Sequence, residues 1–353
     1  MSIADFGWNA RFESLFESLR DEQLIPARVT RVDRGACVVE TGSGSVSAVI
    51  AGRLDPNGEM APAAVGDWVA LEMGDGTNVI RAILPRNGVL ARRRPGAADR
   101  EQVVAANIDF VLVVESLERG PNPRRIERAT ALAWDGGATP VVVLTKTDVC
   151  TDLDAAIARA REGAPFSDVI AVSAVTGDGV IDVAERLTAG TTAVLLGPSG
   201  VGKSTLTNRL LGEERLAVSE VRSGDAKGRH TTTSRELVAL PGGGCLIDTP
   251  GIRELGLWLN AEAVNTAFPE IEEIAVGCRF SDCRHEAEPG CAVLEAVDHG
   301  TLDEGRLASF LRLRKEVENL DLRRDESRRH EVRARERSFG KMVREVMKIK
   351  KNR

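Results

Sequence analysis

The residues with the clearest chemistry in this sequence form a glycine-rich stretch directly after the apolar run 193–196. Its GxxxxGK(S/T) pattern is a P-loop, in which backbone N–H groups surround two phosphates, the lysine reaches the β- and γ-phosphates and a hydroxyl binds Mg²⁺. Residues 206–211 predict the helix whose N-terminus favours the bound anion. The predicted phosphate-binding residues are Gly197, Pro198, Ser199, Gly200, Val201, Gly202, Lys203, Ser204 and Thr205, with Ser204 as a magnesium ligand.

A second loop has the residue types that recognise a guanine base. Thr145-Lys146-Thr147-Asp148 follows the apolar run 141–144 and resembles the (N/T)KxD loop of GTPases. The Asp148 carboxylate accepts two hydrogen bonds, from guanine N1–H and from the exocyclic amine, and adenine does not offer that pair. Lys146 would lie over the base and ribose. The loop therefore favours GTP over ATP as the ligand.

A third loop, Ser173-Ala174, follows the apolar run 169–172 and resembles the element whose backbone N–H meets guanine O6. Motifs this short are common in surface turns when they occur singly. Because these loops lie at successive strand ends of one predicted sheet, we interpret them together as a single nucleotide site.

Two later segments indicate how the γ-phosphate and Mg²⁺ are held. The DxxG sequence 248–251 resembles the element that binds Mg²⁺ through water and meets the γ-phosphate, which assigns Asp248 and Gly251 to GTP binding. The segment 228–233 resembles switch I, and Thr231 or Thr232 is the candidate magnesium ligand.

The order of these motifs differs from that of an ordinary GTPase. The base-reading loops precede the P-loop and DxxG comes last, which indicates a circular permutation. Strand adjacency rather than chain order forms such a site, and breakpoints at the surface are tolerated. The chain after Gly251 is consequently attached directly to the element that senses the γ-phosphate.

A cluster of three cysteines and one histidine follows within fourteen residues. A Cys₃His set satisfies the closed tetrahedral coordination of a structural Zn²⁺. A redox cluster or a group of buried thiols is the alternative, and it leaves the histidine unexplained. The predicted zinc ligands are Cys278, Cys283, His285 and Cys291.

The elements that would position these motifs are of two kinds. Continuous apolar runs alternate with helical stretches from position 107 onward, which predicts a doubly wound α/β domain with a parallel sheet. Five short β-type runs between positions 25 and 94 predict a small closed barrel of the OB type. Such barrels often bind oligonucleotides, and a purely structural barrel is the alternative. The expected α/β strands are 110–114, 141–144, 169–172, 193–196 and 245–247, the expected helices 124–134, 153–162 and 180–187, and the expected barrel strands 27–32, 36–40, 46–50, 67–71 and 79–84.

Composition agrees with an ordinary globular protein that has several domains. The 353 residues are 42% hydrophobic and 28% charged, with a net charge of −6. The sequence has neither a run of eighteen apolar residues nor a signal-peptide pattern at its start, so we expect a cytoplasmic protein that does not bind membranes. We also expect a monomer. The expected domains are an N-terminal helix (1–23), the barrel (24–98), the permuted G domain (99–257) and a mostly helical zinc-binding domain with a basic tail (258–353).

Charge is concentrated in the last part of the chain. The segment 323–353 contains 13 Lys or Arg residues against 5 Asp or Glu residues. Such an excess suits RNA phosphates, although a solvated charged helix has the same composition.

Taken together, the permuted motifs, the preceding barrel and the CxxxxCxHxxxxxC cluster resemble the RsgA/YjeQ family of ribosome-dependent GTPases over essentially the whole chain. The resemblance implies GTP hydrolysis in late maturation of the small ribosomal subunit, contact with its rRNA, and stimulation by the subunit. It also implies a catalytic role for the switch I histidine, here His230, beside Lys203.

Two residues depart from related patterns. Many members of the family have Asn where this chain has Thr145, which puts one contact to guanine or to the P-loop in question. Ras-like enzymes have a water-orienting Gln where this chain has Ile252, so the water must be positioned otherwise. The alternative function is a nucleotide-dependent RNA-binding switch with negligible turnover.

Overall fold

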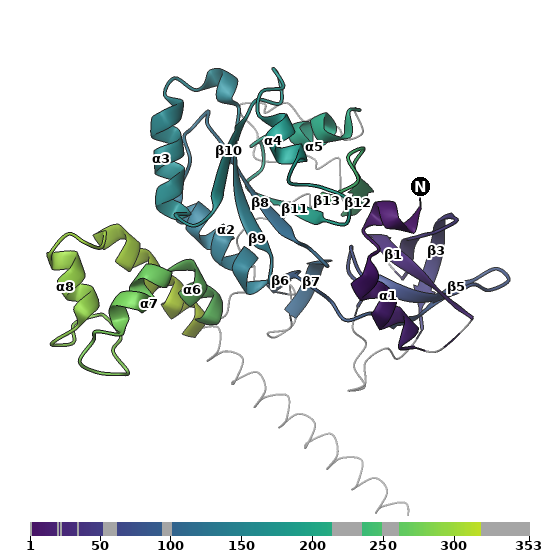
Figure 1. Ribbon diagram of the computed structural model, residues 1–353, viewed down its shortest axis with the longest axis horizontal. Coiled ribbons are helices and arrows are strands. Elements are labelled where there is room, and N and C mark those ends of the chain that lie inside the picture. The colour runs from purple at the N-terminus through teal and green to yellow at the C-terminus, as the bar shows by residue number, and fades with distance from the viewer. Residues whose placement is uncertain are drawn as a thin grey trace, which may run out of the picture. The chain divides into compact units, whose positions relative to one another are not determined.

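The structure is a computed structural model that describes residues 2–19, 21, 23–33, 35–51, 62–93, 101–213, 235–248 and 261–318 (Figure 1). The chain divides into two compact units. The first comprises residues 1–92 and 103–258, and the second comprises residues 93–102 and 259–353.

The first unit contains a parallel sheet that is buried on both faces, which confirms the doubly wound α/β prediction. Neighbouring strands run parallel in the order β10-β9-β8-β11-β13, and β12 pairs antiparallel with β13. Apolar side chains such as Leu112, Val143 and Leu195 are fully enclosed in its core. The strands are β8 (Phe110–Ser116), β9 (Thr139–Thr145), β10 (Asp168–Val172), β11 (Thr192–Leu196), β12 (Glu236–Ala239) and β13 (Cys245–Asp248).

Helices cover both faces of this sheet. Figure 1 shows α2 and α3 together on one side of it and α4 and α5 on the other. Side chains of Asn122 and Asp152 cap the starts of α2 and α3 by accepting backbone N–H groups. The predicted helix 180–187 ends earlier than expected because its last residues tighten into three-residue spacing, as in the bond from Leu187 N to Ala184 O. The bounds are α2 (Pro123–Asp135), α3 (Leu153–Gly163), α4 (Val180–Ala184) and α5 (Lys203–Leu211), with a short 3₁₀ turn η2 (Thr147–Val149).

The predicted five-stranded barrel is present and closed. Its strands follow the order β1-β2-β3-β5-β4, and β4 pairs again with β1. A register shift between Val29 and Arg31 bends the long strand β1, which lets it pair with β4 along one part and with β2 along the next. The strands are β1 (Leu24–Val32), β2 (Cys37–Thr41), β3 (Gly44–Ile50), β4 (Trp68–Glu72) and β5 (Asn78–Ile83).

The N-terminal segment packs on this barrel through aromatic rings. The predicted single helix is interrupted at Gly7, whose φ of 90° ends η1 (Ile3–Phe6) before α1 (Ala10–Glu17) begins. The ring centroids of Trp8 and Trp68 lie 4.8 Å apart, and those of Phe12 and Trp68 lie 5.4 Å apart. The apolar face of this segment therefore packs on its own barrel.

The barrel and the parallel sheet are joined by strand pairing that the sequence did not indicate. Arg31 of β1 pairs with Glu236 of β12, so that the eleven strands form one continuous sheet. The strand β12 has only four residues, too few for a periodic pattern to be recognised. A separate two-stranded sheet consists of β6 (Val89–Arg93) and β7 (Glu101–Ala106).

Arg28 connects four segments of the first unit from a fully buried position. Its guanidinium donates to the carbonyls of Phe6, Gly66 and Asn107 and to the hydroxyl of Thr192, the first residue of β11. It also lies 5.0 Å from the centroid of the neighbouring Trp68 ring. Barrel, N-terminal turn and parallel sheet thus share one buried donor.

Replacing Arg28 by Met should lower the free energy of unfolding by about 3 kcal/mol, because several buried acceptors lose their donor together. The measurement is chemical denaturation monitored by tryptophan fluorescence. Arg31→Met, at a solvent-exposed ion pair on the same strand, is the control and should change stability by less than about 1 kcal/mol. Equal effects of the two substitutions would contradict a central role for Arg28.

The second unit is helical. Phe268 and Phe310 pack edge to face at 5.5 Å, and the Arg306 guanidinium lies 3.9 Å from the Phe268 ring centroid. None of the helices in the described ranges combines the length and hydrophobicity of a membrane span. The helices are α6 (Ala261–Ala267), α7 (Pro269–Ala275), α8 (Ala292–Asp298) and a helix over 304–318.

Candidate nucleotide site and metal centre

The predicted P-loop connects the end of β11 to the start of α5. A side chain at Gly197 would place its Cβ 2.3 Å from the carbonyl of Val114, so only glycine fits beside β8. Gly202 precedes the helix with a φ of 95°, in the left-handed region. The Lys203 ammonium donates to the carbonyls of Gly197 and Pro198, each at 2.7 Å, and is thereby held inside the loop.

The magnesium and phosphate candidates of the P-loop lie in the loop itself and in the first turn of α5. Ser204 and Thr205 occupy the first turn of α5, and both are half-buried. Their backbone N–H groups belong to the helix terminus that attracts anions. Ser199 and Gly200 are exposed at the tip of the loop, whereas Val201 is buried beneath it.

Thr145 links the base-reading loop to the P-loop. Its hydroxyl lies 2.5 Å from the carbonyl of Val201 and 3.1 Å from the carbonyl of Glu115. A hydroxyl has one proton, so it donates to one of these carbonyls at a time. The Thr145 side chain therefore reaches the P-loop.

Asp148 and Ser173 meet although 25 residues separate them along the chain. The Ser173 hydroxyl donates to the Asp148 carboxylate at 2.6 Å and accepts the N–H of Thr176 at 3.1 Å. Ser173 is fully buried, which holds the exposed Asp148 in one orientation. The Ser173 N–H donates to the carbonyl of Asp178, so Ala174 is our candidate for the N–H that meets guanine O6.

Two glutamates that the motifs did not indicate contact residues of the candidate site. Glu118 accepts a hydrogen bond from the Lys146 ammonium at 2.6 Å, and this contact lowers the pKa of the Glu118 carboxyl. Glu115 is buried at the end of β8 and forms a two-bond ion pair with Arg125 of α2, at 2.5 Å for each bond. The sequence signal for the ion pair of Glu115 with Arg125 was a glutamate near the end of an otherwise apolar strand.

The γ-phosphate elements are only partly described. Asp248 is the last residue of β13 and is buried. The strand β13 pairs directly with β11, which leads into the P-loop, as the pairing of Val194 with Ile247 shows. Gly251 and the switch I candidates His230, Thr231 and Thr232 lie outside the described residues. Thr147 lies in η2 between Lys146 and Asp148.

The four predicted metal ligands come together in the second unit. All their ligand atoms lie within 4.8 Å of one another. Cys278 Sγ is 3.8 Å from Cys291 Sγ and 3.6 Å from His285 Nδ1, and His285 Nδ1 is 3.3 Å from Cys291 Sγ. A tetrahedral Zn²⁺ with bonds of about 2.3 Å to sulfur and 2.0 Å to nitrogen separates its ligand atoms by roughly 3.5–3.8 Å. The donor set and its spacing fit zinc.

Backbone groups shape this metal centre. Burial raises the pKa of the Cys278 thiol, but hydrogen bonds from the N–H groups of Val293 and Ala292 at the start of α8, together with those to the thiols of Cys291 and Cys283, outweigh it and hold the pKa below its usual range. The Glu288 carboxylate closes the loop between ligands by accepting the N–H groups of Arg284, Glu286 and Ala287, and the bonds from Arg284 and Ala287 contribute most to lowering its pKa to about 2.

The metal centre is also fastened to the helix 304–318. The rings of His285 and Phe310 lie 6.3 Å apart, and the Arg314 guanidinium donates to the carbonyl of Arg284 at 2.7 Å. His285 itself has a φ of 60°, which a surrounding loop must hold in place. The cluster therefore organises the packing of the second unit.

We expect purified protein to contain one zinc per chain. Cys283→Ala should lose most of it and loosen the second unit, because an incomplete ligand set binds zinc far more weakly. Elemental analysis and limited proteolysis measure the two effects, and GTP affinity should stay unchanged. Cys150→Ala, a half-buried cysteine outside the cluster, is the matched control and should retain its zinc. A folded protein without zinc that is indifferent to strong chelators would contradict the assignment.

Comparison with known proteins agrees with this geometry. The sequence profile of the RsgA GTPase family matches residues 83–258. The small ribosomal subunit biogenesis GTPase RsgA of Streptomyces coelicolor is 43% identical over 353 residues, which cover 99% of this chain and 96% of that protein. The protein of the same name in Xylella fastidiosa is 50% identical over 256 residues, or 72% of this chain and 76% of the relative.

Solved structures share the fold. YjeQ from Thermotoga maritima superimposes with a TM-score of 0.60 at 26% identity, covering 83% of this chain and 98% of that one. YloQ, described as a circularly permuted GTPase, gives a TM-score of 0.60 at 23% identity and supports the fold alone. In the present chain the base-reading strands β9 and β10 likewise precede the P-loop strand β11. This chain therefore belongs to the RsgA family of circularly permuted GTPases.

Proposed function

We propose that this protein hydrolyses GTP on the small ribosomal subunit during the late maturation of that particle, and that the subunit stimulates the reaction. The observation that carries the proposal is that Thr145, Asp148 and Ser173 lie together with the P-loop at the carboxyl ends of neighbouring strands of a single sheet. Binding of GTP requires the loops that recognise guanine and the loop that binds phosphate at the same place. The names of the relatives supply the ribosomal particle as the place of action.

The chemistry follows from the roles of a few side chains. Lys203 would meet the β- and γ-phosphates, and Mg²⁺, bound by Ser204 and by Thr231 or Thr232, would neutralise the charge that develops during phosphoryl transfer. We propose that His230 acts on the attacking water, since Ile252 has no group that could orient it. Positioning and electrostatics supply most of the catalysis in such reactions.

The decisive experiment compares GTP hydrolysis by the free protein and by the protein with purified small subunits. We expect slow hydrolysis alone and a gain of about 10²-fold or more with subunits, which is the scale that a positioned general base contributes. Nucleotide-dependent binding to subunits without any gain in phosphate release would instead support the alternative, an RNA-binding switch. Large subunits serve as the control particle.

The proposal also assigns a function to each domain of the chain. We assign guanine nucleotide binding to the G domain (99–257), rRNA contact to the barrel (24–98), and a zinc-stabilised contact with the particle to the C-terminal domain (258–353). The closed barrel and the clustered zinc ligands support this division. We place the protein in the cytoplasm as a monomer, because its proposed partner assembles there and the described parts of the nucleotide site all come from one chain.

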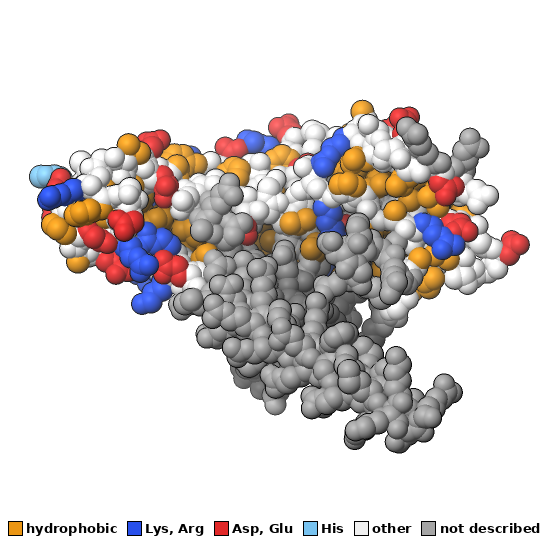
Figure 2. All heavy atoms as spheres, turned by 90° about the horizontal axis from the view of Figure 1, so that it is seen from below, with side chains coloured by type: hydrophobic (Ala, Val, Ile, Leu, Met, Phe, Trp, Pro, Cys, Tyr) orange, Lys and Arg blue, Asp and Glu red, His pale blue; other side chains and the backbone are white. Residues whose placement is uncertain are grey.

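The basic segment 323–353 lies outside the described residues, and we propose that it contacts rRNA. On the described part of the face drawn in Figure 2, acidic and basic side chains are interspersed, so its charge is mixed. The tail has a strong excess of one sign, and each phosphate contact releases counterions. Affinity for subunits should therefore fall steeply with added salt.

Removing residues 323–353 should flatten that dependence by roughly 0.7–0.9 in slope for each phosphate that the tail neutralises. Filter binding at several salt concentrations measures it. A matched variant in which all 13 tail Lys and Arg residues become Gln separates charge from length and should give the same flattening. If both variants keep the parent affinity and slope, the tail is only a solvated charged segment.

A further inference from the structure

The strand β10 forms one edge of the large sheet. It pairs with β9 on one side, and among the strands that the structure describes none pairs with its other side. Alternate residues of an edge strand direct backbone N–H and C=O groups away from the sheet. Such an edge is a template for one more extended chain.

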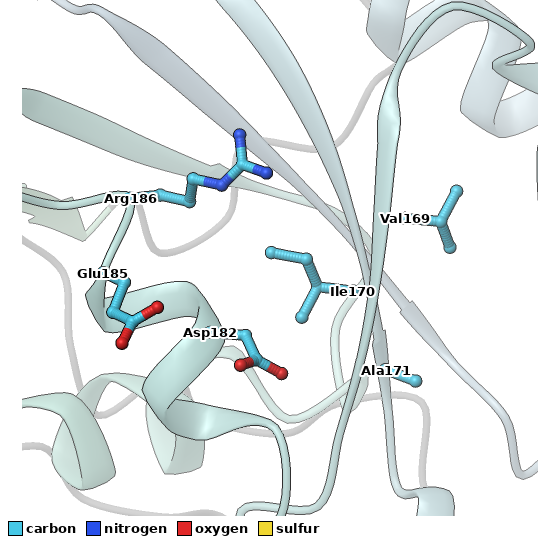
Figure 3. Close-up of a pocket in the computed structure, with 6 residues that line it drawn as sticks. All are labelled: Val169, Ile170, Ala171, Asp182, Glu185 and Arg186. Carbon is cyan, nitrogen blue, oxygen red and sulfur yellow. The ribbon is translucent and has the colours of Figure 1, made fainter.

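A groove of about 490 Å³ lies between β10 and α4 (Figure 3). Three consecutive residues of β10 line it, and side chains alternate between the faces of a sheet, so the groove meets the backbone of this edge strand as well as its side chains. Figure 3 shows Ile170 directed toward the side where α4 lies, and Val169 and Ala171 directed to the other side. The lining residues are Val169, Ile170 and Ala171 of β10 and Asp182, Glu185 and Arg186 from α4 and the turn after it.

The ionisable groups of the groove have an acidic excess. Asp182 and Glu185 are exposed on the helical wall. The single cation of the lining, Arg186, forms an ion pair with Asp168 at 2.7 Å, so its charge is compensated at the start of β10. A chain that lies in the groove would therefore meet two carboxylates whose charge is not balanced within the lining.

Two exposed apolar residues lie close in sequence to the lining of the groove. Phe166, two residues before β10, is 61% exposed, and Ile181 in the first turn of α4 is 64% exposed. Together with Val169, Ile170 and Ala171 of the lining, they give this part of the surface apolar as well as acidic groups. The combination favours an extended ligand that carries both basic and apolar side chains.

We propose that the groove between β10 and α4 binds a basic, extended segment of another protein, which adds to the sheet as a strand beside β10. Backbone hydrogen bonds would supply much of the affinity, and the charge and shape of the groove would supply the specificity. Two other occupants are disfavoured by charge. RNA phosphates would be repelled by Asp182 and Glu185, and a second copy of this chain paired at the same edge would bring like carboxylates together.

The test uses the full chain and a fluorescent octapeptide of alternating Lys or Arg and Val or Ile residues. Fluorescence anisotropy should show saturable binding, and hydrogen exchange should slow at the backbone amides of Asp168–Val172. The same peptide N-methylated at alternate residues along one edge should bind at least ~10-fold more weakly, because a methylated amide donates no hydrogen bond. Equal binding of both peptides without protection of β10 would overturn the proposal.

Variants of the groove test the charge argument. Asp182→Asn combined with Glu185→Gln should lower peptide affinity by at least ~5-fold, the scale of two solvent-exposed ion pairs. Asp75→Asn, in an exposed barrel turn, is the matched control and should bind like the parent. GTP hydrolysis should be unchanged in all three proteins, so failure of peptide binding is distinguishable from failure of the proposed GTPase function.

Two further readouts identify any other occupant. Zero-length carbodiimide cross-linking should join Asp182 or Glu185 to the lysines of the peptide. Cross-links to lysines of the chain's own segment 341–351 instead would assign the groove to the tail and overturn a separate partner. Sedimentation that shows a dimer, with β10 amides protected in the absence of peptide, would assign the edge to a second copy.

Discussion

His230→Ala should retain the GTP affinity of the parent and lose most of the hydrolysis that small subunits stimulate. A positioned imidazole contributes about 10²–10⁴ in rate, and we expect a loss on that scale. Ile252, which takes the place of a water-orienting Gln, leaves His230 as the residue available for that role in the switch segments. Single-turnover hydrolysis with saturating subunits isolates the chemical step from binding and product release.

Two controls separate this role from others. His299→Ala removes an imidazole at the end of α8 and should leave stimulated turnover unchanged. Lys203→Ala should impair both binding and turnover, since its ammonium is held inside the P-loop. A His230→Ala enzyme that subunits stimulate as well as the parent would remove His230 from the mechanism and indicate that it only packs within switch I.

Asp148→Asn should change the nucleotide that the protein prefers. Replacing the carboxylate removes two charge-assisted hydrogen bonds to guanine, each worth roughly 1.5–3 kcal/mol, so GTP affinity should fall by about 10²-fold or more. Xanthine carries a carbonyl where guanine has its amine, and the side-chain amide that this substitution introduces can donate to it. Titration with GTP and with the xanthine triphosphate measures the exchange of preference.

The structure sharpens this prediction through Ser173. Ser173→Ala removes the hydroxyl that orients the Asp148 carboxylate but keeps the charge, so GTP affinity should fall by only about 1 kcal/mol without any gain for xanthine. Asp154→Asn, an exposed carboxylate in the first turn of α3, is the matched control and should behave like the parent. Equal affinity of the native protein for ATP and GTP would contradict guanine recognition by Asp148.

The sequence by itself determined the parts that depend on residue type at fixed spacing. The P-loop is recognisable because only glycines fit positions such as Gly197, where β8 passes closely. The clustering of Cys278, Cys283, His285 and Cys291 could be predicted because Cys₃His within one short segment satisfies one metal geometry. The strands of the G domain were predictable because burial on both faces requires continuous apolar runs.

Contacts between distant segments were decided by the tertiary structure alone. The Thr145 hydroxyl reaches Val201 across 56 positions, and Lys146 meets Glu118 across 28. No local pattern encodes such pairs, because each residue is ordinary in its own segment and only the strand order brings them together. The same holds for Arg28, which in the sequence is one more charged residue of a barrel strand. Its buried place between the N-terminal turn, the barrel and β11 follows from how these elements pack, since only folding removes its guanidinium from water and supplies the acceptors it needs.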